Sequence, residues 1–147
     1  DPPGALTSSF GWNCNENKDF LKEVISKFRI SNIRVSIFVN PSIETLDNLE
    51  EIKTDRVELY TYDFAHYFDD NKTKSIEPYV EVVNYLNKEF PTVELNAGHD
   101  LNLKNLEFFL EKIANIKEVS IGHALICDTL EFGLKETIKK YLSLTKS

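Results

Sequence analysis

The sequence has few of the residues and runs that mark several common protein classes. It contains no methionine and only two cysteines, Cys14 and Cys127, which form no Cys-x-x-Cys pair. Two isolated cysteines are typical of free thiols in a cytoplasmic protein, with a single disulfide as the alternative. No apolar run approaches the roughly 18–20 residues that a membrane helix needs. We therefore expect a cytoplasmic protein that does not span a membrane.

Several motifs of nucleotide, metal and hydrolase chemistry are also absent, namely GxGxxG, the P-loop, GxSxG and HExxH. The net charge of -7 argues against nucleic-acid binding but leaves room for a local phosphate pocket. The first residues, "DPPGALTSSF", lack the basic and apolar regions of a signal peptide. A start at Asp1 without methionine is consistent with a processed or clipped product.

Hydrophobic residues make up 41% of the 147 residues, enough for the core of one domain. Their spacing predicts strands that alternate with helices. The predicted order is a helix over 17–29, a strand over 33–40, a helix over 41–52 capped by Asn40, a strand over 56–62, a loop over 63–74, a helix over 76–89, a strand over 92–98, a helix containing Leu103, Leu106, Leu110 and Ile113, a strand over 118–122, and a last helix containing Leu130, Leu134, Ile138 and Leu142.

Each predicted strand has one apolar face and one polar face. Val57 and Leu59 alternate with Arg56, Glu58 and Tyr60, for example. In a barrel, helices cover the outer, apolar face of the sheet, and polar residues can line the inner face. The alternative is that these polar residues lie at strand ends or on an edge of the sheet. Four strands cannot close a barrel that needs eight. The fold class expected is α/β, the C-terminal half of a (βα)8 TIM barrel.

Two predicted strands end in the same dipeptide, Gly98-His99 and Gly122-His123. In TIM barrels, phosphate commonly binds in the loops after the last two strands, near a helix N-terminus. Glycine lets the backbone approach an anion, and histidine can transfer protons near neutral pH. A lone Gly-His is more often a simple turn. Because two of them occur at matching strand ends, a phosphate pocket is an equal alternative, and in that pocket His99 would be placed for proton transfer.

Other chemistry-bearing residues lie on a strand and in two predicted loops. Glu58 sits within a strand on the polar face, where it would be either catalytic or paired with Arg34 or Arg56. In the loop over 63–74, His66 lies among aspartates, but the spacing fits no metal motif, so a solvated loop is favoured. The stretch 6–11 is a flexible loop, or a lid if a barrel forms. No metal site is expected.

The sequence resembles the pyridoxine 5′-phosphate synthase family at these residues. The matching stretches are "VSIFVN", "VELYT", "LNAGHDLNLKNL" and "IGHALICDTLEFGLKETI", within the span from 33 to 142. The first thirty residues match more loosely, and the family's N-terminal half is absent. The resemblance implies that 1–147 is a single-domain fragment with a lid loop over 1–16, a leading helix and barrel strands five to eight.

The resemblance also implies an enzyme, an octameric ring-closing synthase of vitamin B6 biosynthesis. Its reaction condenses 1-deoxy-D-xylulose 5-phosphate with 3-amino-2-oxopropyl phosphate, without a metal or organic cofactor. The partners implied are these phosphorylated substrates, identical subunits and the N-terminal half of the same barrel. The family's other acid–base residues, a histidine and a glutamate, belong to that half, so residues 1–147 alone would be inactive.

By matching positions, the resemblance makes His99 the proton donor and Glu58 the group that stabilises the transition state. Gly122 and His123 would bind the aminoketone substrate, and Thr7 matches a substrate-contacting threonine more loosely. Asp100 stands where the family usually has glycine. Either its carboxylate caps a helix starting near Leu101, leaving its amide for phosphate, or this turn binds the anion less than the second.

Tyr60 and Tyr62 replace the family's common histidine and glycine, so the loop after that strand is expected to differ in shape. Two other functions remain as alternatives. A different phosphosugar barrel enzyme is possible, but an aldolase would need a lysine on a strand, and no predicted strand contains one. A non-enzymatic half-barrel that associates through its open edges is the other.

Overall fold

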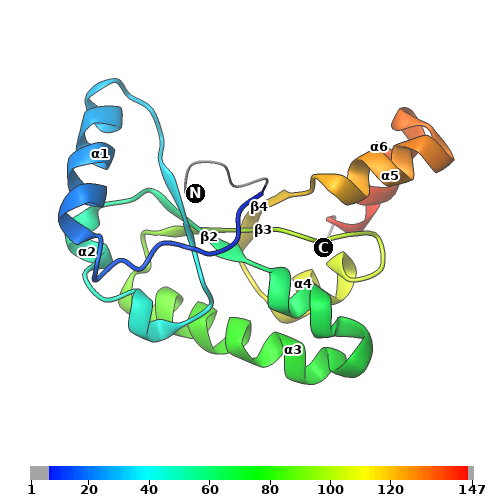
Figure 1. The fold of residues 1–147 in the computed structure, drawn as a ribbon, viewed down its shortest axis with the longest axis horizontal. Coiled ribbons are helices and arrows are strands. Elements are labelled where there is room, and N and C mark those ends of the chain that lie inside the picture. The colour runs from blue at the N-terminus through cyan, green and yellow to red at the C-terminus, as the bar shows by residue number, and fades with distance from the viewer. Residues whose placement is uncertain (1–6, 146–147) are drawn as a thin grey trace.

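The computed structural model describes residues 7–145, which form four strands and six α-helices with one short 3-10 helix (Figure 1). In chain order these are α1 Lys18–Ile30, β1 Ser36–Val39, the 3-10 helix Ile43–Thr45, α2 Leu49–Ile52, β2 Arg56–Tyr60, α3 Tyr62–Glu89, β3 Glu94–Gly98, α4 Leu106–Lys112, β4 Ile116–Ser120, α5 His123–Phe132 and α6 Leu134–Leu144. Within this span, no helix combines the length and the apolar character needed to cross a membrane.

The four strands form one parallel sheet in the order β1-β2-β3-β4. Strands that follow one another in sequence are therefore neighbours in space, joined by segments that contain helices. This order continues in one direction, as barrel strands do, and does not reverse as in a doubly wound sheet. The predicted α/β class with four parallel strands is confirmed.

One face of the sheet is the core of the chain. Side chains of β1, β2 and β3 that point to this face are at most 4% exposed, and they are Ile37, Val39, Val57, Leu59, Leu95 and Ala97. Buried residues of α3 and α4, including Leu86, Leu106 and Phe109, belong to the same core. These strand positions are those predicted from the two-residue period. Burial of this apolar surface is the main force that holds the helices on the sheet.

Both cysteines are free, as predicted. Cys14 is fully buried in the core, and burial raises the pKa of its thiol to about 11. The thiol therefore stays protonated at neutral pH and behaves as a small apolar side chain. Cys127 is exposed on α5.

The predicted helix over 41–52 is wrong. The segment contains only the 3-10 helix Ile43–Thr45 and the single turn of α2, because Asn48 has a left-handed backbone (φ 65°) that separates them. Asn40 does not cap a helix. Its Oδ1 instead accepts a hydrogen bond from the backbone N–H of Gly11 at 2.9 Å. A Cβ at Gly11 would lie 2.2 Å from the carbonyl carbon of Val39, so glycine lets the N-terminal segment cross the end of β1.

The predicted loop over 63–74 is also wrong, because most of it lies in the first part of α3. Two phenylalanines hold it there. Phe64 is fully buried and packs edge-on against Phe109, with 5.0 Å between ring centroids, and Phe68 packs edge-on against Phe108 at 5.7 Å. The backbone of Asn71 is non-helical and divides α3 into two parts. The Asn71 side chain accepts a hydrogen bond from the N–H of Lys74, as an N-cap does. Polar composition alone had concealed this short amphipathic helix.

The C-terminal part differs from the prediction in two ways. β4 runs over Ile116–Ser120 rather than 118–122, so it does contain a lysine, Lys117, which is exposed. The last helix is broken at Gly133, whose φ of 78° suits glycine. The predicted apolar face, Leu130, Leu134, Ile138 and Leu142, is between 41% and 85% exposed. Figure 1 shows α5 and α6 at the far end of the sheet from α1.

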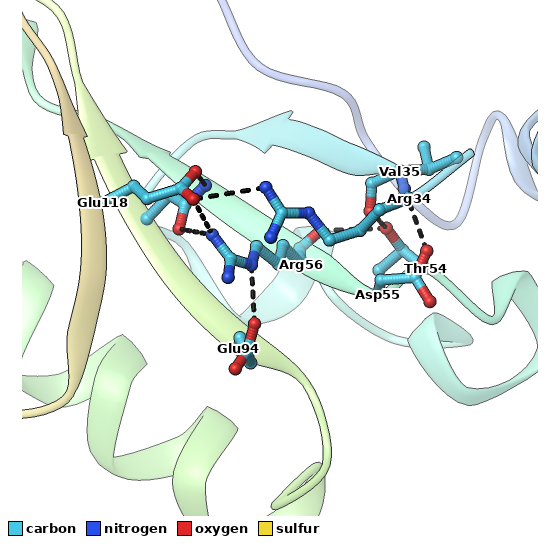
Figure 2. A network of polar contacts seen from close by, with 8 residues as sticks. Arg34, Val35, Thr54, Asp55, Arg56, Glu94 and Glu118 are labelled. Carbon is cyan, nitrogen blue, oxygen red and sulfur yellow. Dashed lines mark hydrogen bonds and ion pairs between the residues drawn. The ribbon is translucent and has the colours of Figure 1, made fainter. Parts of the chain in front are cut away.

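A network of charges covers the other face of the sheet near the start of its strands (Figure 2). Arg56 is 7% exposed and lies 2.6 Å from an oxygen of Glu94 and 2.7 Å from an oxygen of Glu118. Arg34 approaches the same oxygen of Glu118 at 3.2 Å, and Asn96 donates to the other at 3.3 Å. The two carboxylates thus neutralise a buried guanidinium, and the network ties β2, β3 and β4 together.

Glu118→Gln is expected to destabilise the protein at neutral pH. The hydrogen bond from Arg56 holds the pKa of Glu118 below its usual value of 4.5, with help from Arg34. A carboxyl group whose pKa is lowered by folding adds stability above its unfolded pKa, and this stability is lost as pH falls through the folded pKa. The deficit of the variant should therefore be full at neutral pH and shrink below about pH 4.5.

The measurement is the urea midpoint of both proteins across this pH range. Glu136→Gln is the matched control, because the side chain of Glu136 is about as exposed as that of Glu118 (55% and 51%), but the side chain of its partner Lys139 is 59% exposed, whereas that of Arg56 is 9% exposed. Exposed pairs of this kind contribute little. If Glu118→Gln behaves like Glu136→Gln at neutral pH, or if its deficit persists in acid, the network does not stabilise the sheet in this way.

Candidate active site

The carboxyl ends of β2 and β3 bring the predicted residues to one edge of the sheet. Tyr60 is paired with Gly98 in the register of these strands, so His99 follows at the end of β3 beside the turn from β2 into α3. Gly122 and His123 follow β4 after a short connection. This edge is where barrel enzymes place their catalytic groups.

His99 has an unusual backbone. Its φ is 95°, and the next residue, Asp100, has a φ of 58°. Two successive non-glycine residues in this region store strain of order 1–3 kcal/mol each, and such outliers concentrate at functional sites. The left-handed backbone at 100 is one that glycine adopts more readily than aspartate.

The imidazole of His99 is held between aromatic rings and polar groups. The ring packs edge-on against Tyr60, with 4.8 Å between centroids, and against Tyr62 at 6.0 Å. Nε2 lies 3.4 Å from the hydroxyl oxygen of Thr7, as a loose hydrogen bond. Nδ1 lies 3.1 Å from a carboxylate oxygen of Asp100 but makes no aligned hydrogen bond. An imidazole in this position can exchange a proton with a bound molecule, and a proton transfer of this kind is chemistry that histidine performs.

Asp100 does not cap a helix, contrary to the first of its two expected alternatives. The next helix, α4, begins only at Leu106, and no side-chain cap from Asp100 reaches it. The expectation of a helix starting near Leu101 is wrong, because Asn102 and Asn105 build a hydrogen-bonded turn there instead. The side-chain amides of both asparagines donate to the Asp100 carbonyl at 3.3 and 3.2 Å.

Glu58 does not pair with Arg34 or Arg56, contrary to one alternative. Both arginines are engaged nearer the start of the strands by the network of Figure 2. The half-buried carboxylate of Glu58 lies over Gly98 instead, where a Cβ would be 2.3 Å from its Oε1. Among the described residues it has no ion-pair partner. Glycine at 98 thus admits a carboxylate next to His99.

Gly122 and His123 form the N-terminal end of α5. Gly122 is the cap residue, and the helix starts at His123. The first turn of α5 contains no acidic residue, so its free N–H groups present a positive partial charge. A Cβ at Gly122 would meet nothing within 4 Å, and His123 is exposed. Free N–H groups at a helix start are a common anion site, and phosphate binding at this end stays a prediction.

The structure divides the predicted residues between two neighbouring hollows. The larger has a volume of about 1090 Å³, and its lining includes Thr7 and His99. The smaller, of about 330 Å³, is lined by Asp100, Gly122 and His123 among others. The ring of Tyr62 borders both hollows. The two Gly-His turns are therefore close to one another, but His99 and the end of α5 face different spaces.

The rings of Tyr60, Tyr62 and His66 lie along the two hollows, with Tyr60 lining the larger, His66 the smaller and Tyr62 both. Tyr62 stacks on Tyr60 at 6.0 Å and on His66 at 5.5 Å. Burial raises the pKa of Tyr60, and the nearby carboxylates of Asp100 and Asp63 add to this effect. Its hydroxyl contacts the Ser8 carbonyl at 3.5 Å. In place of the differently shaped loop that was predicted here, a helix begins at Tyr62.

His66 lies on α3 rather than in a loop, and its neighbours have other partners. Asp69 pairs with Lys104 at 2.5 Å, and the imidazole of His66 also packs edge-on against Tyr67. Across residues 7–145, no three or more His, Cys, Asp or Glu side chains are grouped to hold a metal ion.

Comparison with known proteins gives the family. The model of the family described as pyridoxal phosphate biosynthesis protein PdxJ matches residues 1–147. The chain belongs to this family. It is 44% identical over 146 residues to pyridoxine 5′-phosphate synthase from Flavobacterium johnsoniae and 46% identical over 147 residues to that from Parabacteroides distasonis. These alignments cover 99% and 100% of this chain.

The chain spans 61% of the length of each of these two curated relatives. The PdxJ family has the TIM-barrel fold, so the four parallel strands are a partial barrel, as predicted. The resemblance noted from "LNAGHD" and "IGHALI" is confirmed by the family match. The roles of individual residues remain predictions that rest on the geometry above.

Proposed function

We propose that this chain carries part of the active site of a pyridoxine 5′-phosphate synthase, an enzyme of vitamin B6 biosynthesis. The substrates proposed are 1-deoxy-D-xylulose 5-phosphate and 3-amino-2-oxopropyl phosphate, which condense to a pyridine ring with release of phosphate and water. The observation that carries the proposal is the position of His99. It lies on a strained turn at the carboxyl end of β3 and beside a large hollow. The Glu58 carboxylate lies over Gly98, the residue that precedes His99.

In this proposal His99 transfers protons to the reacting oxygen and nitrogen atoms. Imine formation, loss of water and ring closure each require such transfers, and a histidine can make them near neutral pH. The carboxylate of Asp100 lies 3.1 Å from Nδ1 of the same ring. The Thr7 hydroxyl at Nε2 occupies the direction in which a substrate oxygen would bind. Thr7 is thus proposed to contact substrate from the segment that precedes α1.

Glu58 is proposed to stabilise positive charge that develops in the transition state. Its half-buried carboxylate has no cation beside it among the described residues, so its negative charge is free to act on a bound intermediate. The N–H groups at Gly122 and His123 are proposed to bind a substrate phosphate at the start of α5. Asp100 borders the same hollow, where its backbone N–H rather than its carboxylate would face the anion.

Glu58→Gln is expected to lower kcat by on the order of 10²-fold, because the neutral amide keeps the shape but loses the charge. Gly98→Ala is expected to lower kcat similarly, since a methyl group at 98 would displace the carboxylate from its place. The combined variant should be little worse than either single variant, because both remove the same interaction. Steady-state kinetics of the three variants measure this. Independent, multiplying losses would show that Gly98 and Glu58 do not act together.

The proposal further includes a homo-octamer located in the cytoplasm and completion of the barrel by an N-terminal part. The exposed apolar face of α5 and α6 supports additional packing partners, since Leu130 is 85% exposed. Analytical ultracentrifugation of the natural protein tests the octamer, and cell fractionation tests the location.

The activity itself is tested by incubating the natural full-length protein with both substrates. Pyridoxine 5′-phosphate should form, measured by mass spectrometry, together with free phosphate. Each substrate alone should give no product. Product formation from a single substrate, or none from both, would exclude the proposed synthase.

A further inference from the structure

The turn at His99 is held through the backbone carbonyls of three successive residues. The Gly98 carbonyl accepts a hydrogen bond from the Thr61 N–H at 2.9 Å, which continues the pairing of β2 with β3. The His99 carbonyl accepts one from the Thr61 hydroxyl at 2.5 Å. The Asp100 carbonyl is bound by the amides of Asn102 and Asn105. One residue on another segment, Thr61, therefore binds both peptide units that flank the α-carbon of His99.

Thr61 is itself fixed by its surroundings. Its side chain is fully buried at the turn between β2 and α3. Its own carbonyl accepts the N–H of Ala65 in the first turn of α3 at 3.0 Å. The residue before it, Tyr60, has its carbonyl bound by the hydroxyl of Tyr79 at 2.9 Å, and Tyr79 is 1% exposed. The hydroxyl of Thr61 is thus presented to His99 from a rigid position.

We propose that Thr61 is a positioning residue for His99. The Thr61 hydroxyl holds His99 in the strained turn, and this turn aims the imidazole at the substrate. This inference rests on the proposed function and adds a residue to it. The physical reason is the strain at φ 95° and 58°. Without a partner for the His99 carbonyl, the turn would relax toward ordinary backbone angles, and the ring would move with the backbone. A displacement of about 1 Å at a catalytic group can cost about 10²-fold in rate.

The test replaces Thr61 by residues that separate its hydroxyl from its shape. Thr61→Val keeps the branched shape and removes the donor, whereas Thr61→Ser keeps the donor. Thr137→Val is the matched control, because Thr137 is also fully buried but its hydroxyl has no partner among the described residues, and it lies in α6 away from the site. All variants are made in the natural full-length protein.

Thr61→Val is expected to lower kcat by on the order of 10²-fold with little change in KM, because substrate binding groups are left in place. Thr61→Ser should recover most of this loss, and Thr137→Val should leave kcat unchanged. A kcat for Thr61→Val within about twofold of the unmodified protein would overturn the inference. Equal losses in the valine and serine variants would also overturn it, since the hydroxyl would then be irrelevant.

A spectroscopic measurement separates this inference from the proposed function. The edge-on ring of Tyr60, 4.8 Å away, shifts the NMR signals of the His99 ring protons. Thr61→Val should change these signals and the amide signals from Gly98 to Asp100, and Thr61→Ser and Thr137→Val should not. If the unmodified protein makes no pyridoxine 5′-phosphate, the proposed function fails, and these signals alone decide the role of Thr61.

One measurement does not require any variant to fold. In the unmodified protein, the Thr61 hydroxyl proton should exchange slowly with water and show a through-bond coupling to the His99 carbonyl carbon. A rapidly exchanging hydroxyl proton would contradict the proposal, whatever the variants show.

Discussion

His99→Ala is expected to abolish most of the synthase turnover while leaving the fold intact. Removing a positioned proton donor costs on the order of 10²–10⁴-fold in rate. The fold should survive because the strained backbone at 99 is held by its carbonyl contacts and not by the imidazole. Alanine at φ 95° adds some strain, so the variant should unfold at a slightly lower temperature.

The kinetic measurement is kcat for both substrates, with circular dichroism as the check on the fold. His66→Ala is the comparison variant, because this histidine stacks on Tyr62 and borders the smaller hollow but has no part in the proposed proton transfer. It should change kcat far less than His99→Ala. Near-normal turnover in a folded His99→Ala protein would remove His99 from the mechanism and leave the turn without its proposed purpose.

A polypeptide of residues 1–147 alone is expected to show no synthase activity. It contains a four-stranded sheet, whereas a closed barrel needs eight strands. Its relatives are longer, since the chain covers 61% of their length. The family resemblance places a further histidine and glutamate in the N-terminal half of the barrel, outside residues 1–147. With those groups missing, proton transfer steps lack their partners even if His99 and Glu58 keep their geometry.

The assay uses this polypeptide alone and then mixed with the N-terminal part of the Parabacteroides distasonis relative, which is 46% identical. Activity should appear only in the mixture. Within residues 7–145 no further strand pairs with β1 or β4, and α6 has an exposed apolar face, so both regions offer surfaces for the added part. Ring closure by residues 1–147 alone, in a preparation shown by intact mass to contain nothing else, would refute the division of the site.

The sheet was predictable from sequence because its apolar residues keep a strict two-residue period. Val57 and Leu59 point into the core, and Arg56 and Glu58 point away, as their alternation required. The polar residues 63–74 gave no such signal. There, Phe64 and Phe68 pack against α4, and this packing stabilises a helix. Such a tertiary contact cannot be recognised from local sequence.

The site was predictable in its residue types and less so in its contacts. The repeated Gly-His identified both turns, and the family resemblance named Glu58. The sequence could not show that Glu118, rather than Glu58, takes up Arg34 and Arg56, because the choice depends on strand register. Thr61 was missed because a buried threonine between a strand and a helix looks like a simple cap, and its acceptor lies 38 residues away in the chain.

The central claim is that the ends of β3 and β4 form the substrate site of a pyridoxine 5′-phosphate synthase. A crystal structure of the natural full-length protein with 3-amino-2-oxopropyl phosphate tests it most directly. The phosphate is predicted to lie at the N–H groups of Gly122 and His123, with a reacting substrate atom within hydrogen-bond distance of His99 Nε2. A substrate bound elsewhere, with His99 and the start of α5 both out of contact, would contradict the claim.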